Sequence, residues 1–99
     1  MARGILARIR TAVADGAYDI SAHALDEMAD DNLEVWDLEA AVLTGHVHER
    51  QRDDPRGVRY VLRGWAADRD TPVGVVCRFT DTGRLLIITV YRMTPPDDA

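Results

Sequence analysis

The hydrophobic positions in the first half of the chain recur with a helical period. Ile5, Ile9 and Val13 fall on one side of a helix predicted at residues 3–14, and Gly16 follows as a stop signal. The pattern does not determine whether this helix packs into the core. It predicts only that one side of the helix is apolar.

Two further helices are predicted before the midpoint of the chain. Ser21 can cap a helix at residues 22–31, because its side-chain oxygen can accept a backbone N–H of the first turn. This stretch contains no Gly, Pro or β-branched residue. Residues 35–44 carry an apolar stripe, and Gly45 after them is predicted to end the helix in a left-handed conformation.

From residue 47 onward the pattern changes to that of strands. Four strands are predicted, at residues 47–52, 59–66, 73–79 and 85–91. Short connections rich in turn residues join antiparallel neighbours. The sequence therefore predicts an α+β fold with two or three N-terminal helices on one face of a four-stranded antiparallel β-meander in the order 1-2-3-4. The period does not tell which face the helices cover.

The composition is that of a globular chain with one core. Of the 99 residues, 46% are hydrophobic and 29% are charged, which is ordinary for a single domain. We expect residues 1–93 to form that domain and residues 94–99, which contain two prolines and two aspartates, to be a flexible tail. No apolar run approaches the roughly 20 residues that span a bilayer, and the N-terminus lacks a signal-peptide core. A cytoplasmic protein is the expectation.

Charge is distributed unevenly along the chain. The formal net charge is −5, which argues against sequence-independent binding to nucleic acid, since that binding depends on cations at phosphates. Residues 1–45 hold three Arg and nine acids, whereas residues 46–99 hold nine Arg and eight acids. The helical half is therefore acidic, and the strand half is slightly basic.

Several motifs occur in a characteristic order: SAHALDEM at residues 21–28, residues 37–45, DPRG with RYVL within residues 54–62, and IITVY at residues 87–91. Together they resemble the small bacterial family called domain of unknown function 4258. The resemblance implies a fold similar to ribonuclease toxins of the RelE, MqsR and BrnT type, which are often encoded beside a small antitoxin. Possible partners are thus an RNA substrate and a small antitoxin-like protein.

This chain departs from the family pattern at two positions of the second helix. Many members carry Arg where this chain has Glu27, and another basic residue where it has Asp31. The resemblance therefore implies that a role in handling phosphate has changed or been lost in an acidic subset of the family.

His23 is the first candidate for catalysis. Glu27 lies one helical turn further on the same side, where its carboxylate can hold the imidazole ring. Metal-free RNA cleavage needs a base for the 2′-hydroxyl, an acid for the departing 5′-oxygen and cations for the charge on phosphorus. The alternative is that His23 is a solvated or capping residue of the first helical turn.

The strands supply the candidate cations and hydroxyls. Arg59 and Arg63 point to one face of the second strand, and Arg78 interrupts an apolar third strand. Phosphate binding and an ion pair between Arg78 and an acid of the second helix are both consistent with this pattern. Thr89 and Tyr91 share a face of the fourth strand, where they could position a phosphate or a water, although both residue types also favour strands intrinsically.

Other chemistry receives less support from the sequence. His46 and His48 form a His-x-His pair that could bind a metal, but no second pair with ligand spacing exists, so no metal and no cofactor is predicted. Cys77 is the single cysteine and lies in an apolar run, which indicates a buried hydrophobe rather than a nucleophile.

Two functions remain open at this point. The first is a toxin-like, metal-independent endoribonuclease that uses His23, Glu27 and the three arginines. The second is a non-catalytic interaction module, a degenerate relative of such toxins, that binds a basic partner through its acidic helical face.

Overall fold

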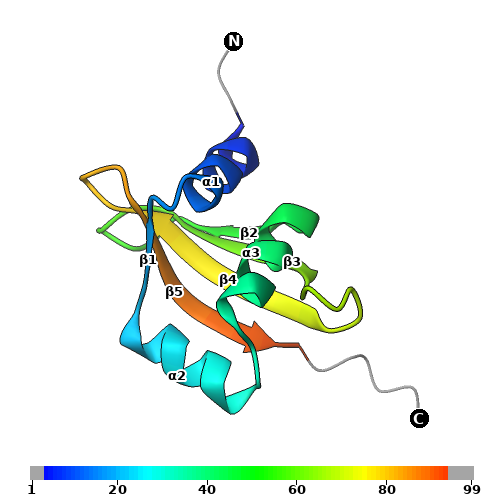
Figure 1. Ribbon diagram of the computed structural model, residues 1–99. Coiled ribbons are helices and arrows are strands. Elements are labelled where there is room, and N and C mark those ends of the chain that lie inside the picture. The colour runs from blue at the N-terminus through cyan, green and yellow to red at the C-terminus, as the bar shows by residue number, and fades with distance from the viewer. Residues whose placement is uncertain (1–3, 94–99) are drawn as a thin grey trace.

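The computed structural model describes residues 4–93 and contains three helices and one sheet (Figure 1). The elements follow one another as α1 (Ile5–Ala14), β1 (Tyr18–Ile20), α2 (Ala22–Asp30), α3 (Val35–Thr44), β2 (His46–Gln51), β3 (Arg59–Trp65), β4 (Pro72–Phe79) and β5 (Leu85–Arg92). The α+β class, the three helices and the four strands of the meander are confirmed. The tail expected at residues 94–99 lies outside the described residues.

The sheet has one strand more than the sequence predicted. Residues 18–20 form β1, which pairs in parallel with β5, and the strand order is β1-β5-β4-β3-β2. The sheet is therefore mixed, and the prediction of a purely antiparallel four-stranded sheet was wrong. Three residues are too short to show the alternation by which a strand is recognised. Pairing with β5 is what makes this segment a strand.

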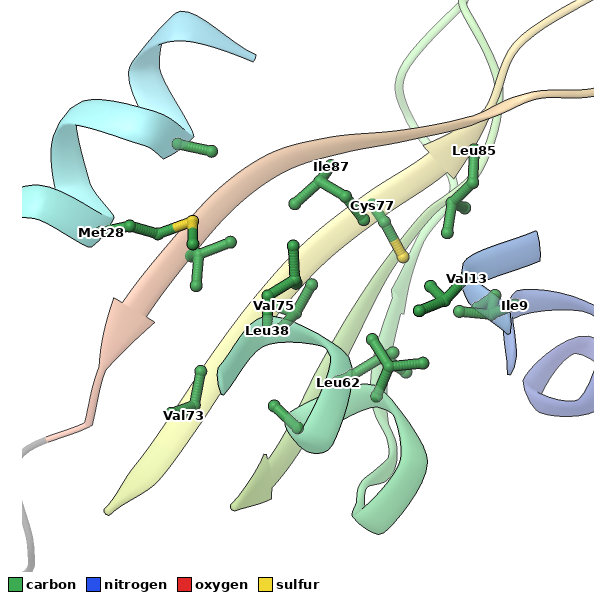
Figure 2. Close-up of a cluster of buried hydrophobic side chains, with 14 of the residues drawn as sticks. Ile9, Val13, Met28, Leu38, Leu62, Val73, Val75, Cys77, Leu85 and Ile87 are labelled. Atoms are coloured by element: carbon green, nitrogen blue, oxygen red, sulfur yellow. The ribbon is translucent and has the colours of Figure 1, made fainter. Parts of the chain in front are cut away.

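All three helices pack on one face of the sheet, and the core lies between them. Val73, Val75 and Cys77 alternate along β4 toward the helices and are fully buried (Figure 2). Ile9 and Val13 of α1 are buried in the same cluster. The first helix is therefore part of the core, which the sequence pattern had left open.

Cys77 behaves as the sequence indicated. Its side chain is fully buried among apolar residues, and this burial raises the pKa of the thiol to about 12. A thiol in this environment stays protonated at neutral pH and is a poor nucleophile.

Helix α2 closes the edge of β5 that β1 leaves open. A carboxylate oxygen of Glu27 accepts the backbone N–H of Val90 at 3.2 Å, and one of Asp31 accepts the N–H of Arg92 at 2.9 Å. The Ser21 hydroxyl caps α2 by accepting the N–H of Ala24, and it donates to a carbonyl of β5 at 2.8 Å. Glu27 of α2 and Asp31, which follows the helix as its C-cap, thus take the place of a neighbouring strand.

None of the helices within residues 4–93 is long and apolar enough to cross a membrane.

Candidate functional site

The sheet face opposite the helices, here called the open face, carries the side chains that alternate with those of the core. The strand register aligns them in three rows across β2, β3, β4 and β5. The first row is His46, Arg63, Gly74 and Tyr91, and the second is Glu49, Val61, Val76 and Thr89. The third is Gln51, Arg59, Arg78 and Leu86, where Arg59 and Arg78 each lie one residue beyond the last paired residues of β3 and β4, Tyr60 and Cys77. Three arginines and one acid therefore occupy these rows.

All five candidate residues of the strands lie on the open face. Arg63 and Tyr91 belong to the first row, Thr89 to the second, and Arg59 and Arg78 to the third. The strand pattern predicted only that members of one strand share a face, whereas the register shows that different strands contribute to a common face. The phosphate candidates are thus gathered on one surface.

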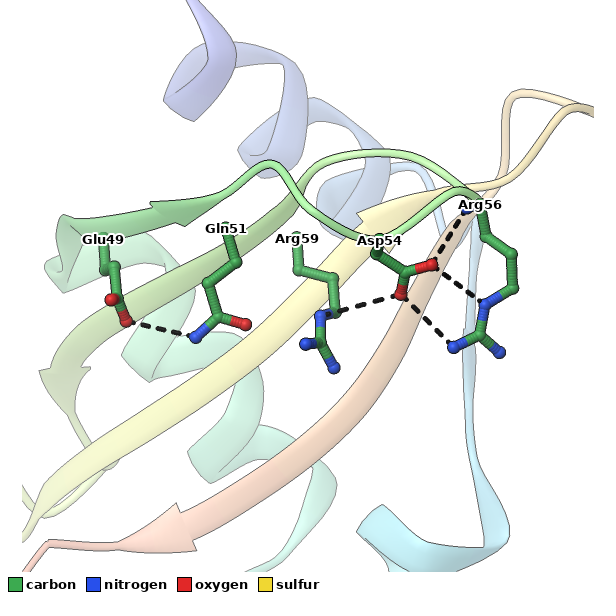
Figure 3. A network of polar contacts seen from close by, with 5 residues as sticks. All are labelled: Glu49, Gln51, Asp54, Arg56 and Arg59. Carbon is green, nitrogen blue, oxygen red and sulfur yellow. Dashed lines mark hydrogen bonds and ion pairs between the residues drawn. The ribbon is translucent and has the colours of Figure 1, made fainter.

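Arg59 forms an ion pair with Asp54, a residue that was not among the candidates from the sequence. Its Nε lies 3.7 Å from Asp54, whose side chain is only 6% exposed and also receives two guanidinium N–H groups of Arg56 (Figure 3). In the same view, Gln51 donates to Glu49 at 3.1 Å. Because Asp54 offsets its charge, Arg59 is less suited to phosphate than Arg63 and Arg78.

Asp54 makes the stability of this corner of the sheet dependent on pH. The guanidinium of Arg56, and next its backbone N–H, hold the Asp54 pKa below its usual value. Its stabilising contribution is therefore complete above the unfolded-state pKa of about 3.9 and is lost as pH falls through the lower folded-state pKa. We expect the melting temperature, followed by circular dichroism, to fall below about pH 4, and to fall less steeply in Asp54→Asn. Equal slopes in both proteins would contradict this.

Arg78 has no ion pair with α2. Its side chain points away from the helices, and no salt bridge joins it to an acid within residues 4–93. The ion pair considered from the sequence is therefore absent from the described part of the chain. Arg78 instead lines an open depression of about 530 Å³ beside Arg56, Thr80 and Asp81.

His23 and Glu27 form the predicted pair. His23 Nε2 lies 3.4 Å from Glu27 Oε1, and the histidine side chain is 69% exposed. The same carboxylate oxygen accepts the N–H of Val90, so Glu27 also holds the sheet edge. Within residues 4–93, no hydrogen bond or ion pair links His23 to the arginines of the open face.

The order of side chains around α2 places His23 relative to the sheet. Leu25 lines a cleft beside α3, Met28 is buried in the core, and Glu27 reaches the β5 edge. At 100° per residue, His23 comes next after Glu27, on the side that turns away from the core. His23 therefore lies where α2 adjoins the border of the open face.

The His-x-His pair does not form a metal site within the described residues. A β-bulge between Val47 and Glu49 leaves His48 without a strand partner and interrupts the alternation on which the same-face arrangement depended. No group of three or more His, Cys, Asp or Glu within residues 4–93 could hold a metal ion.

Sequence reasoning missed Asp54 and Gly74. Asp54 belongs to the Asp-Pro-Arg-Gly motif, which forms a turn in which the N–H of Gly57 donates to the Asp54 carbonyl. Its contact with Arg59 depends on how β3 continues from that turn. Gly74 interrupts an apolar strand, a position that often marks a close approach of another group. Here the outer end of Tyr91 lies over it.

Fold and site together define a small α+β protein whose sheet is covered by helices on one face and presents arginines on the other. The family model described as domain of unknown function (DUF4258) matches residues 20–92, and the chain belongs to this family. The matched segment contains α2, α3 and the four antiparallel strands. No curated protein and no solved structure matches the chain. The similarity to RelE, MqsR and BrnT toxins stays a prediction.

Proposed function

We propose that this chain is a toxin-like, metal-independent endoribonuclease that holds RNA on its open face. The observation that carries the proposal is the convergence of the strand candidates on one surface whose rows contain a single acid, Glu49. Planar guanidinium groups bind phosphate oxygens through paired N–H donors. A surface of this kind can hold an RNA backbone even though the whole chain is acidic.

In this proposal, residues of the open face stabilise the phosphate and His23 at its border transfers protons. Arg63 and Arg78, which make no ion pair within residues 4–93, would stabilise the charge that develops on phosphorus. His23 would remove the proton of the 2′-hydroxyl or protonate the leaving 5′-oxygen, and Glu27 would orient its ring. RNA would then cross β5 on its way from the arginines to α2.

Incubation of the purified protein with cellular RNA in EDTA tests this proposal. We expect cleavage that leaves 2′,3′-cyclic phosphate ends, together with growth arrest on induced expression. His23→Ala should lower the cleavage rate about 100-fold or more, the usual contribution of a general acid or base. Arg78→Ala should also lower it.

Asp26→Ala is the matched control, because Asp26 is exposed on the same helix and touches neither His23 nor the sheet edge in the contacts of residues 4–93. Intact RNA and unaffected growth with the wild-type protein would reject the ribonuclease function. Cleavage that survives His23→Ala would reject the mechanism while keeping the class.

The helical side favours a second candidate function, the docking of a basic partner such as a small antitoxin-like protein. An apolar cleft of about 250 Å³ lies between α2 and α3, lined by Leu25, Met28, Ala29, Leu33, Glu34 and Val35. Trp36, the residue after Val35 in α3, is 61% exposed. Residues 11–49 contain no Arg or Lys. An apolar cleft in acidic surroundings fits a basic segment with apolar anchors.

A further inference from the structure

Tyr91 and Gly74 are matched to each other across β5 and β4. The two residues are partners in the strand register, and a Cβ on Gly74 would lie 2.5 Å from the Tyr91 hydroxyl oxygen and 2.6 Å from its Cε2. Any other residue at position 74 would therefore displace the ring. The absent side chain lets the outer half of the ring lie across β4.

The ring is accessible on the open face. Tyr91 is only partly buried, and none of the side-chain hydrogen bonds within residues 4–93 involves its hydroxyl. The hydroxyl is therefore available to water. The exposed part of the ring offers aromatic surface that a ligand can cover.

Arg63 continues the row that Tyr91 begins. It pairs with Gly74 from the other side, so the ring and the guanidinium lie on the two strands that flank β4. With neighbouring strands about 4.8 Å apart, the two Cα atoms are about 10 Å apart. An aromatic surface at this distance from a cation suits a base and the phosphate of a nearby nucleotide.

We propose that Tyr91 is a stacking platform for an unpaired base and that the open face takes single-stranded rather than duplex RNA. This inference rests on the proposed binding of RNA by the open face. A base in a duplex is already stacked between its neighbours and cannot cover the ring. Stacking therefore selects for single strands, while Arg63 contributes charge without regard to base.

Binding of three labelled probes, measured by fluorescence anisotropy, tests the platform. The probes are a decamer of 2′-O-methyluridine, which has no free 2′-hydroxyl and cannot be cleaved through it, an abasic decamer with the same backbone, and an RNA duplex of the same length. We expect the uridine decamer to bind best. Tyr91→Phe should keep this affinity, whereas Tyr91→Leu should weaken it about 10-fold or more and leave the abasic decamer unaffected.

Gly74→Ala is an independent probe of the same contact. Its new Cβ meets the movable end of a side chain, so the ring is expected to shift while the strand stays folded. Its affinity should then resemble that of Tyr91→Leu. Gly4→Ala, where a Cβ would meet nothing within 4 Å, is the control. If circular dichroism shows that Gly74→Ala is unfolded, the affinities of Tyr91→Phe and Tyr91→Leu for the uridine decamer test the platform without it.

Equal binding of the uridine and abasic decamers would reject the platform but leave the arginine-based RNA surface standing. Equal affinity of Tyr91→Leu and wild type would also reject it. If no probe binds the wild-type protein, the platform and the proposed function both fail.

Discussion

Glu27→Ala combined with Asp31→Ala is expected to lower the free energy of unfolding by about 2–4 kcal/mol, because each change removes the acceptor of a β5 backbone N–H. Val90 contributes most of this loss, since its residue is fully buried and water cannot easily replace the carboxylate. The N–H of Arg92 lies in an exposed residue and contributes less. Urea unfolding at neutral pH measures the effect.

Two control pairs separate the acceptors from the charges. Glu27→Gln with Asp31→Asn keeps an acceptor oxygen at both positions and should retain most of the stability. Asp26→Ala with Asp30→Ala removes exposed acids of the same helix and should change the free energy of unfolding by less than about 0.5 kcal/mol. If the Gln/Asn pair destabilises as much as the Ala pair, the carboxylates do not act as acceptors for the sheet edge.

These bonds bear on the departure from the family pattern that the sequence suggested at positions 27 and 31. An Arg at position 27 would offer no acceptor for the N–H of Val90, so a chain with Arg there would have to close the β5 edge differently. In this chain the acids at positions 27 and 31 both bond backbone N–H groups of β5. Cations for RNA must therefore come from the sheet.

Arg63→Glu combined with Arg78→Glu is expected to weaken RNA binding about 100-fold or more at low salt, since each lost charged hydrogen bond to phosphate costs about 1.5–3 kcal/mol. For single strands, the slope of log affinity against log salt should also fall in magnitude by about 1.4, or about 0.7 for each phosphate contact. Fluorescence anisotropy with the uncleavable uridine decamer gives both quantities.

A variant with the same change of net charge controls for long-range effects. Arg8→Glu with Arg69→Glu alters two arginines that belong to none of the three open-face rows. It should reduce affinity much less. If both double variants weaken binding equally, net charge and not the open face governs the interaction.

The sequence predicted those helices and strands that have a clear hydrophobic period or are bounded by capping and turn residues. Ser21 identified the start of α2, because an N-cap is a local feature. Gly45 does mark the end of α3, but the left-handed conformation predicted for it was wrong: its backbone is extended, and a Cβ there would meet backbone atoms of Ala41 and Arg63. β1 was missed because residues 18–20 become a strand only by pairing with β5, which lies far away in the sequence. The mixed sheet follows from that long-range contact.

In the candidate site too, local features were predicted from the sequence and long-range contacts were not. The His23–Glu27 pair was predicted because spacing within one helix fixes it. The common face of Arg63, Arg78 and Tyr91 depends on the register between strands, which turn residues determine only in part. The Gly74–Tyr91 contact also depends on register and could not be read from either strand alone.

The central claim is that RNA binds the open face, and mapping the bound surface by NMR tests it most directly. Isotope-labelled protein would be titrated with the uncleavable uridine decamer, and backbone amide shifts would be followed. We predict the largest changes at Arg63, Arg78 and Tyr91 and in the residues between them on β3, β4 and β5. Changes confined to the α2–α3 cleft around Leu25 and Val35, or no changes at all, would contradict the claim.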